Sequence, residues 1–209
     1  MNYKDYKNTR DLVWEILIRE RVDKLPVSVS ELCRNMGIPV RLYESTDDNS
    51  GKSLILNGQP VIFVNSTDTP ERQRFTAAHE LGHILLGHVG KYKLVNREPT
   101  AGDNPIEQAA NVFASRLLAP ACVLWGCNMR TAGEIAVNCK ISRQAAEYRA
   151  ERMDILYKRN AFLTSPLECE VYDNFKQYIE THKLEFGYLP VKESSSYERS
   201  LPAFLFILN

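Results

Sequence analysis

Apolar and charged residues alternate with a helical period at the start of the chain. Within residues 9–24, apolar side chains at 12, 13, 16 and 17 recur with charges between them, which predicts an amphipathic helix. Pro26 ends this helix because proline cannot continue it. A short second helix is expected next, capped by Ser28 or Ser30 and stopped by Gly37.

The pattern changes to short apolar runs over residues 38–64. The runs are IPVRLYE, SLIL and PVIFV, and the last two are joined through Asn57-Gly58. An Asn-Gly pair between two β-rich runs favours a tight hairpin, although the connection could extend through Gln59. We therefore predict a small antiparallel sheet of about three strands here.

Helices are predicted for most of the remaining chain, and a proline or a capping residue marks each start. Thr69-Pro70 opens the first of them, and Pro105 opens the next. Strands followed by a series of helices predict an α+β fold. The expected helices cover residues 70–87, 105–118, 131–140, 142–157 and 167–183, with a loop over 90–104.

Composition limits the class of protein. The chain has 209 residues, of which 44% are hydrophobic and 25% charged, so it can form a core. These values exclude a disordered chain and a disulfide-stapled miniprotein. The 26 basic and 26 acidic residues give a net charge of zero, which disfavours a protein whose main task is gripping nucleic acid.

Several features predict a cytoplasmic location without a membrane partner. No run approaches the ~20 apolar residues that span a bilayer. The polar start MNYKDYKNTR lacks the apolar core of a secretory signal. The five cysteines are odd in number and scattered, which is typical of buried reduced thiols.

Three of the four histidines lie close together, at positions 79, 83 and 88. The first two belong to an H-E-x-x-H motif, His79-Glu80-Leu81-Gly82-His83, in which a spacing of four puts both imidazoles on one helix face. Two imidazoles so placed can bind one zinc ion. Glu80, on the neighbouring face, can take a proton from water as a general base. The pattern has only three fixed positions, so it also occurs by chance.

A catalytic zinc site needs a third protein ligand. His88 is nearest, but the H-E-x-x-H-x-x-G-x-x-H pattern fails at positions 86 and 89, so the helix dipole explains His88 better. Glu107 lies on the next predicted helix, and Asn111, one turn later, could bond a ligand imidazole. However, Asn104-x-x-Glu107 is also a capping-box pattern, so Glu107 could simply cap its helix. The spacing leaves both readings of Glu107 open.

A family resemblance is carried by two strings, RQRFTAAHELGHILLGH and IEQAANVFASRLLAP. They resemble the ImmA/IrrE-type metallo-endopeptidases, which are zinc peptidases of bacteria and their mobile elements. The similarity extends over residues 9–157 and includes DLVWEIL, LPVSVSELCRNMGIPV, PVIFVN and EIAVNCKISRQAAEYRAERM. It is far more specific than H-E-x-x-H alone.

This resemblance implies a zincin-like fold and assigns roles to particular residues. His79, His83 and Glu107 would be zinc ligands, Glu80 the general base, and Asn111 the hydrogen-bond partner of a ligand. It also implies a narrow protein substrate, a helix-turn-helix transcriptional repressor, whose cleavage relieves repression in a mobile element or a stress response.

Three sections are expected: a zincin-like metallopeptidase domain over 1–125, a helix-turn-helix-like segment over 126–159, and an extension of unassigned role over 160–209. Residues 131–159 of the second section contain six basic and four acidic residues, a net charge of +2. This is a weak electrostatic footprint, so specific DNA binding is not expected and partner docking is favoured.

Two functions from different classes fit these observations. The first is a zinc endopeptidase whose extended substrate pairs along an edge strand of the sheet. The second is a non-catalytic binding module, with the zinc site absent or structural, that docks to a repressor or to DNA. Glu80 favours the peptidase, because a structural two-histidine site needs no acid between its ligands.

Overall fold

The computed structural model describes residues 2–46, 49–90 and 104–184. The expected loop over 90–104 and the end of the 160–209 extension lie largely outside these residues. The elements in chain order are α1 (Tyr3–Arg19), α2 (Val29–Asn35), β1 (Val40–Tyr43), β2 (Gly51–Leu56), β3 (Gln59–Asn65), α3 (Pro70–Leu85), α4 (Pro105–Leu118), α5 (Ala121–Gly126), α6 (Ala132–Cys139), α7 (Arg143–Lys158), α8 (Pro166–Asn174) and α9 (Lys176–His182).

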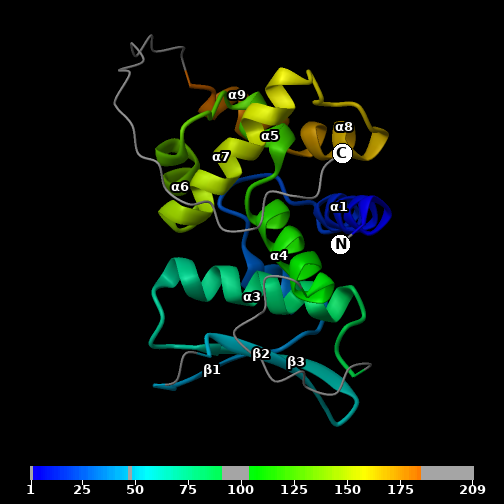
Figure 1. Cartoon of the computed structure of the whole chain (residues 1–209), viewed down its shortest axis with the longest axis vertical. Helices are drawn as coiled ribbons and strands as arrows, with labels where there is room; N and C mark the ends of the chain where they lie inside the picture. Colours follow the sequence, from blue (N-terminus) through cyan, green and yellow to red (C-terminus); the bar gives the residue numbers. More distant parts are fainter. Residues whose placement is uncertain (1, 47–48, 91–103, 185–209) are drawn as a thin grey trace.

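The elements form layers, as Figure 1 shows. The sheet lies at one end of the molecule, and α3 runs across one of its faces in contact with β2 and β3. On the side of α3 away from the sheet, α4 packs against α3 and α1 packs against α4. The predicted α+β class is confirmed, and α3 is held between the sheet and the helical part.

The sheet corrects one prediction, because it is mixed rather than antiparallel. Its strand order is β1-β3-β2, with β2 antiparallel and β1 parallel to β3. Asn57 and Gly58 form a two-residue turn with φ of 51° and 80°, so Leu56 pairs directly with Gln59. This hairpin leaves two edges open to a third strand. β1 adds to the β3 edge, where Val40 pairs with the buried Ile62, and runs parallel to β3.

The first helix also differs from its prediction. The apolar pattern predicts it over 9–24, but α1 starts at Tyr3 and ends at Arg19. The side chain of Asn2 accepts a hydrogen bond from the Asp5 N–H at 2.9 Å, which caps the helix before the apolar pattern begins. Arg21 adopts a positive φ of 52° just after the C-cap residue Glu20, so the helix ends seven residues before Pro26.

The later helices follow their predicted starts. Ser28 caps α2, Thr69 caps α3, and Ser142 caps α7. Thr131 and Glu134 form the complete capping box at the start of α6. Local start signals are therefore reliable along this chain, because each satisfies N–H groups that the helix leaves unpaired.

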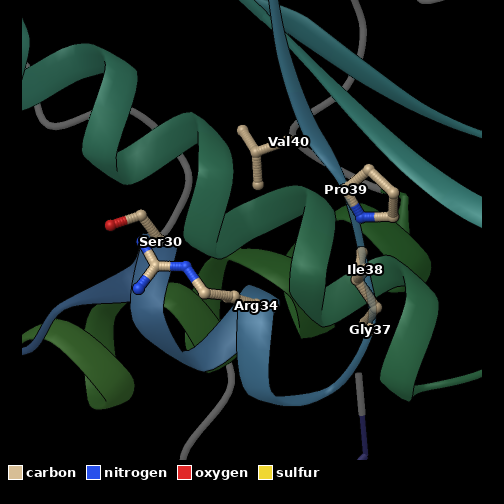
Figure 2. A pocket seen from close by; sticks show the side chains of 6 residues that line it. All are labelled: Ser30, Arg34, Gly37, Ile38, Pro39 and Val40. Carbon is tan, nitrogen blue, oxygen red and sulfur yellow. The ribbon is translucent and has the colours of Figure 1, made fainter.

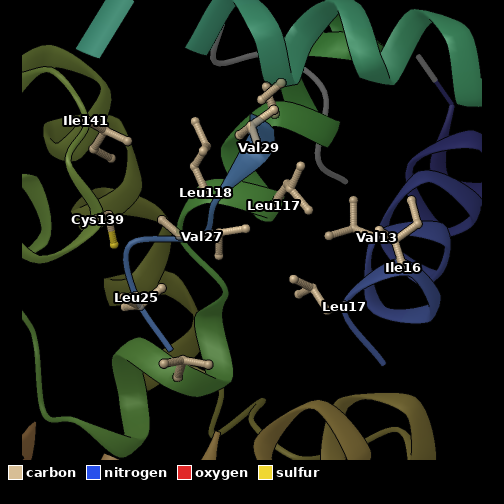
Figure 3. Packing of buried hydrophobic residues seen from close by; sticks show 14 of the residues in the cluster. Val13, Ile16, Leu17, Leu25, Val27, Val29, Leu117, Leu118, Cys139 and Ile141 are labelled. Atoms are coloured by element: carbon tan, nitrogen blue, oxygen red, sulfur yellow. The ribbon is translucent and has the colours of Figure 1, made fainter. Parts of the chain in front are cut away.

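One hydrophobic core joins the helices. Its buried residues extend from Val13 in α1 to Ile179 in α9, and thus include residues from all three predicted sections. Figure 3 shows Val13 and Leu17 of α1 lying near Leu117 of α4. The section boundaries at 125 and 159 remain predictions.

Two further predictions concern the core. The sequence predicts no run that could span a membrane. In the structure, the segment Pro105–Gly126 is nevertheless long and apolar enough to do so by length and composition. However, 78% of its apolar window is buried and Pro120 divides it into α4 and α5, as in a core helix. All five cysteines are free; four of them are buried and Cys169 is half-buried, and their reduced state stays a prediction. Burial raises the pKa of Cys33 to about 11 and that of Cys139 to about 12.

Candidate metal centre

The H-E-x-x-H motif lies in the second half of α3, where the helix is covered by its neighbours. Pro70 occupies the first turn, and Thr69 caps it by accepting a hydrogen bond from the Arg72 N–H. His79, Glu80 and His83 are only 7%, 3% and 8% exposed. Polar groups this buried need partners, so their contacts indicate what the site can do.

The site depends on a close approach between α3 and α4. A Cβ atom added at Gly82 would lie 2.9 Å from Cδ1 of Phe113, closer than real Cβ contacts come. Gly82 therefore lets the Phe113 ring pack directly on the backbone of α3. This contact brings the start of α4, with Glu107, toward the two histidines.

Three side chains converge between the two helices. Nε2 of His79 and Nε2 of His83 are 3.0 Å apart. The Glu107 carboxylate places one oxygen 3.2 Å from Nε2 of His79 and the other 3.4 Å from Nε2 of His83. All three ligand atoms lie within 4.8 Å of one another, so together they could hold a metal ion.

The two readings of Glu107 can be compared directly in this geometry. The Asn104 side chain caps α4 by accepting from the Ile106 N–H at 3.0 Å, not from the Glu107 N–H that a capping box would use. The Glu107 carboxylate faces the histidines instead. Hydrogen bonds from His79 and His83 hold the pKa of the Glu107 carboxyl well below its usual range, against the opposing effect of burial.

Each histidine is held from behind by a second polar group. Nδ1 of His79 lies 2.9 Å from Oδ1 of Asn111. Because an amide oxygen only accepts, Nδ1 of His79 is the donor to Asn111, and Nε2 of His79 faces the cluster. Nδ1 of His83 lies 3.0 Å from Nδ1 of His88.

The position of His88 follows from the end of α3. The His88 N–H donates to the His83 carbonyl at 2.8 Å, and the Gly87 N–H donates to the Ile84 carbonyl at 3.0 Å. These are the two bonds of a Schellman motif, which folds His88 back beneath His83. His88 thus lies behind a predicted ligand, and the cluster itself consists of His79, His83 and Glu107.

Sequence reasoning missed Ser53, which bonds the predicted general base. Its hydroxyl on β2 donates to Oε2 of Glu80 at 2.7 Å. Ser53 pairs with Ile62 of β3, so its side chain is on the sheet face that α3 covers. No local motif marks this serine, because the contact depends on how the sheet packs against α3.

A separate pocket of about 390 Å³ lies beside α2 and the link to β1 (Figure 2). It is lined by Ser30, Arg34, Gly37, Ile38, Pro39 and Val40. None of these residues belongs to the cluster, so this pocket is not part of the candidate site.

Comparison with known proteins gives the class that this fold and this cluster define. The family described as IrrE N-terminal-like domain, peptidase M78, matches residues 33–151. The chain therefore belongs to the ImmA/IrrE family of metallopeptidases.

Two curated relatives carry the name radiation response metalloprotease IrrE. The protein from Deinococcus radiodurans is 37% identical over 97 residues, covering 42% of this chain and 30% of the relative. The protein from Deinococcus deserti is 38% identical over 104 residues, covering 44% of this chain and 36% of the relative. The matches thus span about a third of each relative's length.

A solved structure described as a Mycobacterium tuberculosis transcriptional regulator is also similar. The similarity has a TM-score of 0.44 at 15% identity and covers 78% of this chain and 52% of that chain.

Proposed function

We propose that this chain is a zinc-dependent endopeptidase that cleaves a specific protein substrate in the cytoplasm. The observation that carries the proposal is the convergence of His79, His83 and Glu107, next to the buried carboxylate Glu80. Membership of a metallopeptidase family supports peptide-bond hydrolysis as the class of reaction. The substrate we propose is a helix-turn-helix transcriptional repressor, whose cleavage would relieve repression.

The spacing of the three ligand atoms supports zinc as the metal. With zinc–nitrogen distances near 2.0–2.1 Å, neighbouring ligand atoms of a tetrahedron lie about 3.3 Å apart. Here the two Nε2 atoms are 3.0 Å apart, and the two Glu107 oxygens lie 3.2 Å from Nε2 of His79 and 3.4 Å from Nε2 of His83 respectively. Two imidazoles, one carboxylate and an open fourth position are the donor set of a catalytic zinc site.

The residues of the chain would divide the chemistry among them. Bound zinc would activate a water molecule and polarise the substrate carbonyl. Glu80 accepts the proton of the attacking water and returns it to the leaving amine. Ser53 fixes one carboxylate oxygen of Glu80, and Asn111 keeps His79 in the tautomer that ligates through Nε2.

The sheet supplies a place for an extended substrate. β2 is an edge strand that contacts α3, and its Ser53 reaches Glu80. A substrate segment that pairs along β2 would therefore run beside the proposed catalytic residues. Ile55, on the same face of β2 as Ser53, is 47% exposed, so an apolar substrate side chain could contact it.

The variant Glu80→Gln tests the proposal against a non-catalytic binding module. Glutamine has the shape of glutamate but cannot take the proton, and general-base assistance is worth about 10²–10⁴ in rate. We expect cleavage of the repressor to fall by that factor, with zinc content and fold unchanged. Glu71→Gln, in the first turn of α3, is the matched control and should cleave like the wild type.

Derepression in cells separates the two classes of function. The peptidase proposal expects Glu80→Gln to leave the repressor intact and the genes silent. A docking module needs no general base, so normal derepression by Glu80→Gln would overturn the peptidase proposal. Repressor cleavage should be followed by the appearance of its fragments as well as by reporter expression.

A further inference from the structure

A cluster of arginines lies away from the metal centre, where three helices meet. It consists of Tyr6 on α1, Arg116 on α4, and Arg149 and Arg152 on α7. Arg116 and Arg152 both donate from Nη2 to the Tyr6 hydroxyl oxygen, the latter at 2.9 Å. The Arg116 guanidinium also stacks over the Tyr6 ring, 4.6 Å from its centroid.

The positive charges of this cluster are not balanced by ion pairs. Every ion pair found within the described residues involves side chains other than these three arginines. Glu168 interacts electrostatically with Arg116 but forms no ion pair with it among the described residues, and its carboxylate accepts a hydrogen bond from the Thr164 N–H at 3.2 Å. Burying like charges without a counter-charge is unfavourable, so the proximity of these three arginines needs a physical reason.

Two guanidinium N–H groups of the cluster have no hydrogen-bond partner among the residues that the structure describes. They are Nη2 of Arg149 and Nε of Arg152, and both atoms are buried. Arg149 is only 4% exposed and donates from Nε to the Ala119 carbonyl at the end of α4, at 2.8 Å. That bond gives Arg149 a structural role, but it leaves the Nη2 donor of Arg149 and the Nε donor of Arg152 unexplained.

The titration behaviour of the cluster agrees with this charge imbalance. Burial, together with the nearby charge of Arg116, lowers the pKa of Arg149 to about 10. Burial alone would raise the pKa of Tyr6, but Arg116, Arg152 and Arg149 together lower it. Both shifts indicate a region of high positive potential, which a negative ligand would relieve.

We propose that Arg116, Arg149 and Arg152 form a binding site for a small oxyanion of the phosphate class. Guanidinium N–H groups are strong donors to phosphate oxygens, and Arg149 and Arg152 each have one such donor without a partner among the described residues. Tyr6, Arg116 and Arg152 are half-buried, so one side of the cluster lies at the surface, while the two unpartnered donor atoms are buried beneath it. Free phosphate and the phosphate group of a larger metabolite share this chemistry.

The test is a titration of the zinc-loaded full chain with inorganic phosphate, with AMP as a second arm. Binding is measured by calorimetry, and unfolding temperature is measured at constant ionic strength against chloride. We expect saturable binding and a rise in unfolding temperature with phosphate. A response to AMP that exceeds the response to phosphate would identify a carried phosphate group as the ligand.

Two variants of α7 locate the bound anion. Arg152→Gln removes one of the unpartnered donors, and hydrogen bonds to charged groups are worth enough to weaken binding by about tenfold or more. Arg143→Gln removes an equal charge from an exposed residue that pairs with Glu147, and it should bind like the wild type.

Several outcomes would overturn the proposal. The wild type could show no saturable binding, which would mean that water satisfies the two donors. Binding unaffected by Arg152→Gln would place the anion elsewhere, the metal centre included. If Arg143→Gln weakened anion binding as much as Arg152→Gln does, the loss would come from the change in net charge and not from a site at Arg152. None of these outcomes bears on peptidase activity, which the Glu80→Gln experiment tests separately.

Discussion

The substitution Gly82→Ala is the sharpest test of how the fold builds the metal centre. The added Cβ would lie 2.9, 3.0 and 3.1 Å from Cδ1, Cγ and Cβ of Phe113. Carbon atoms pack at about 3.5–4.0 Å, so α3 and α4 must separate by about 0.5 Å or more. Overpacking of this kind destabilises a protein by about 1–3 kcal/mol, and the better helix propensity of alanine offsets about 1 kcal/mol.

The decisive quantity is metal affinity rather than stability. Glu107 lies on α4 and both histidines lie on α3, so separating the helices moves the carboxylate away from the two Nε2 atoms. We expect a loss of about 0–2 kcal/mol in the free energy of unfolding of the metal-free protein. Zinc affinity, measured by competition with a chromogenic chelator, should fall by roughly ten- to a hundredfold.

Gly133→Ala is the matched control for this experiment. Gly133 lies in the first turn of α6, where an added Cβ meets only atoms at 3.7 and 3.9 Å, an ordinary contact distance. This variant should be at least as stable as the wild type and bind zinc with unchanged affinity. If Gly82→Ala were also stable with unchanged zinc affinity, the close approach at Phe113 could not be what positions Glu107.

Two further substitutions and one binding assay test the remaining assignments. Glu107→Ala should abolish zinc binding measured by metal analysis; a pure capping role would instead leave zinc content intact and reduce stability by about 1 kcal/mol. Ser53→Ala should slow repressor cleavage by about tenfold with zinc content unchanged, and Ser53→Thr, which keeps the hydroxyl, should restore most of the rate. The purified chain should leave no footprint on duplex DNA at physiological salt, and a footprint that persists there would contradict the charge argument for α6 and α7.

Local signals account for the parts of the fold that the sequence predicts well. Thr69-Pro70, Pro105 and Thr131 each act within one helical turn, so their effect does not depend on the rest of the molecule. The same is true of the Asn57-Gly58 turn and of the four-residue spacing between His79 and His83. These features fixed the helix that carries the motif and the hairpin that faces it.

Non-local packing accounts for what the sequence could not predict. A hairpin offers two edges, and nothing within IPVRLYE indicates which edge β1 joins or that it runs parallel to β3. Ser53 and Glu80 are far apart in sequence, and their hydrogen bond exists only because α3 covers one face of the sheet. Spacing alone likewise left Glu107 between two roles, since both need a carboxylate near the start of α4.

The arginines of α7 show how a charge count can mislead until the fold is known. Arg149 and Arg152 contribute to the net charge of +2 over residues 131–159, but both direct donor atoms into the protein. Without them, four basic residues remain, and all four are exposed. The segment also carries four acidic residues, so its outward charge is close to balanced. A helix-turn-helix outline with a neutral face cannot neutralise the several phosphates that duplex binding requires. Arg149 and Arg152 therefore raise the counted charge of the segment without being placed to contact DNA. Their buried donor atoms are better placed to bind one small anion.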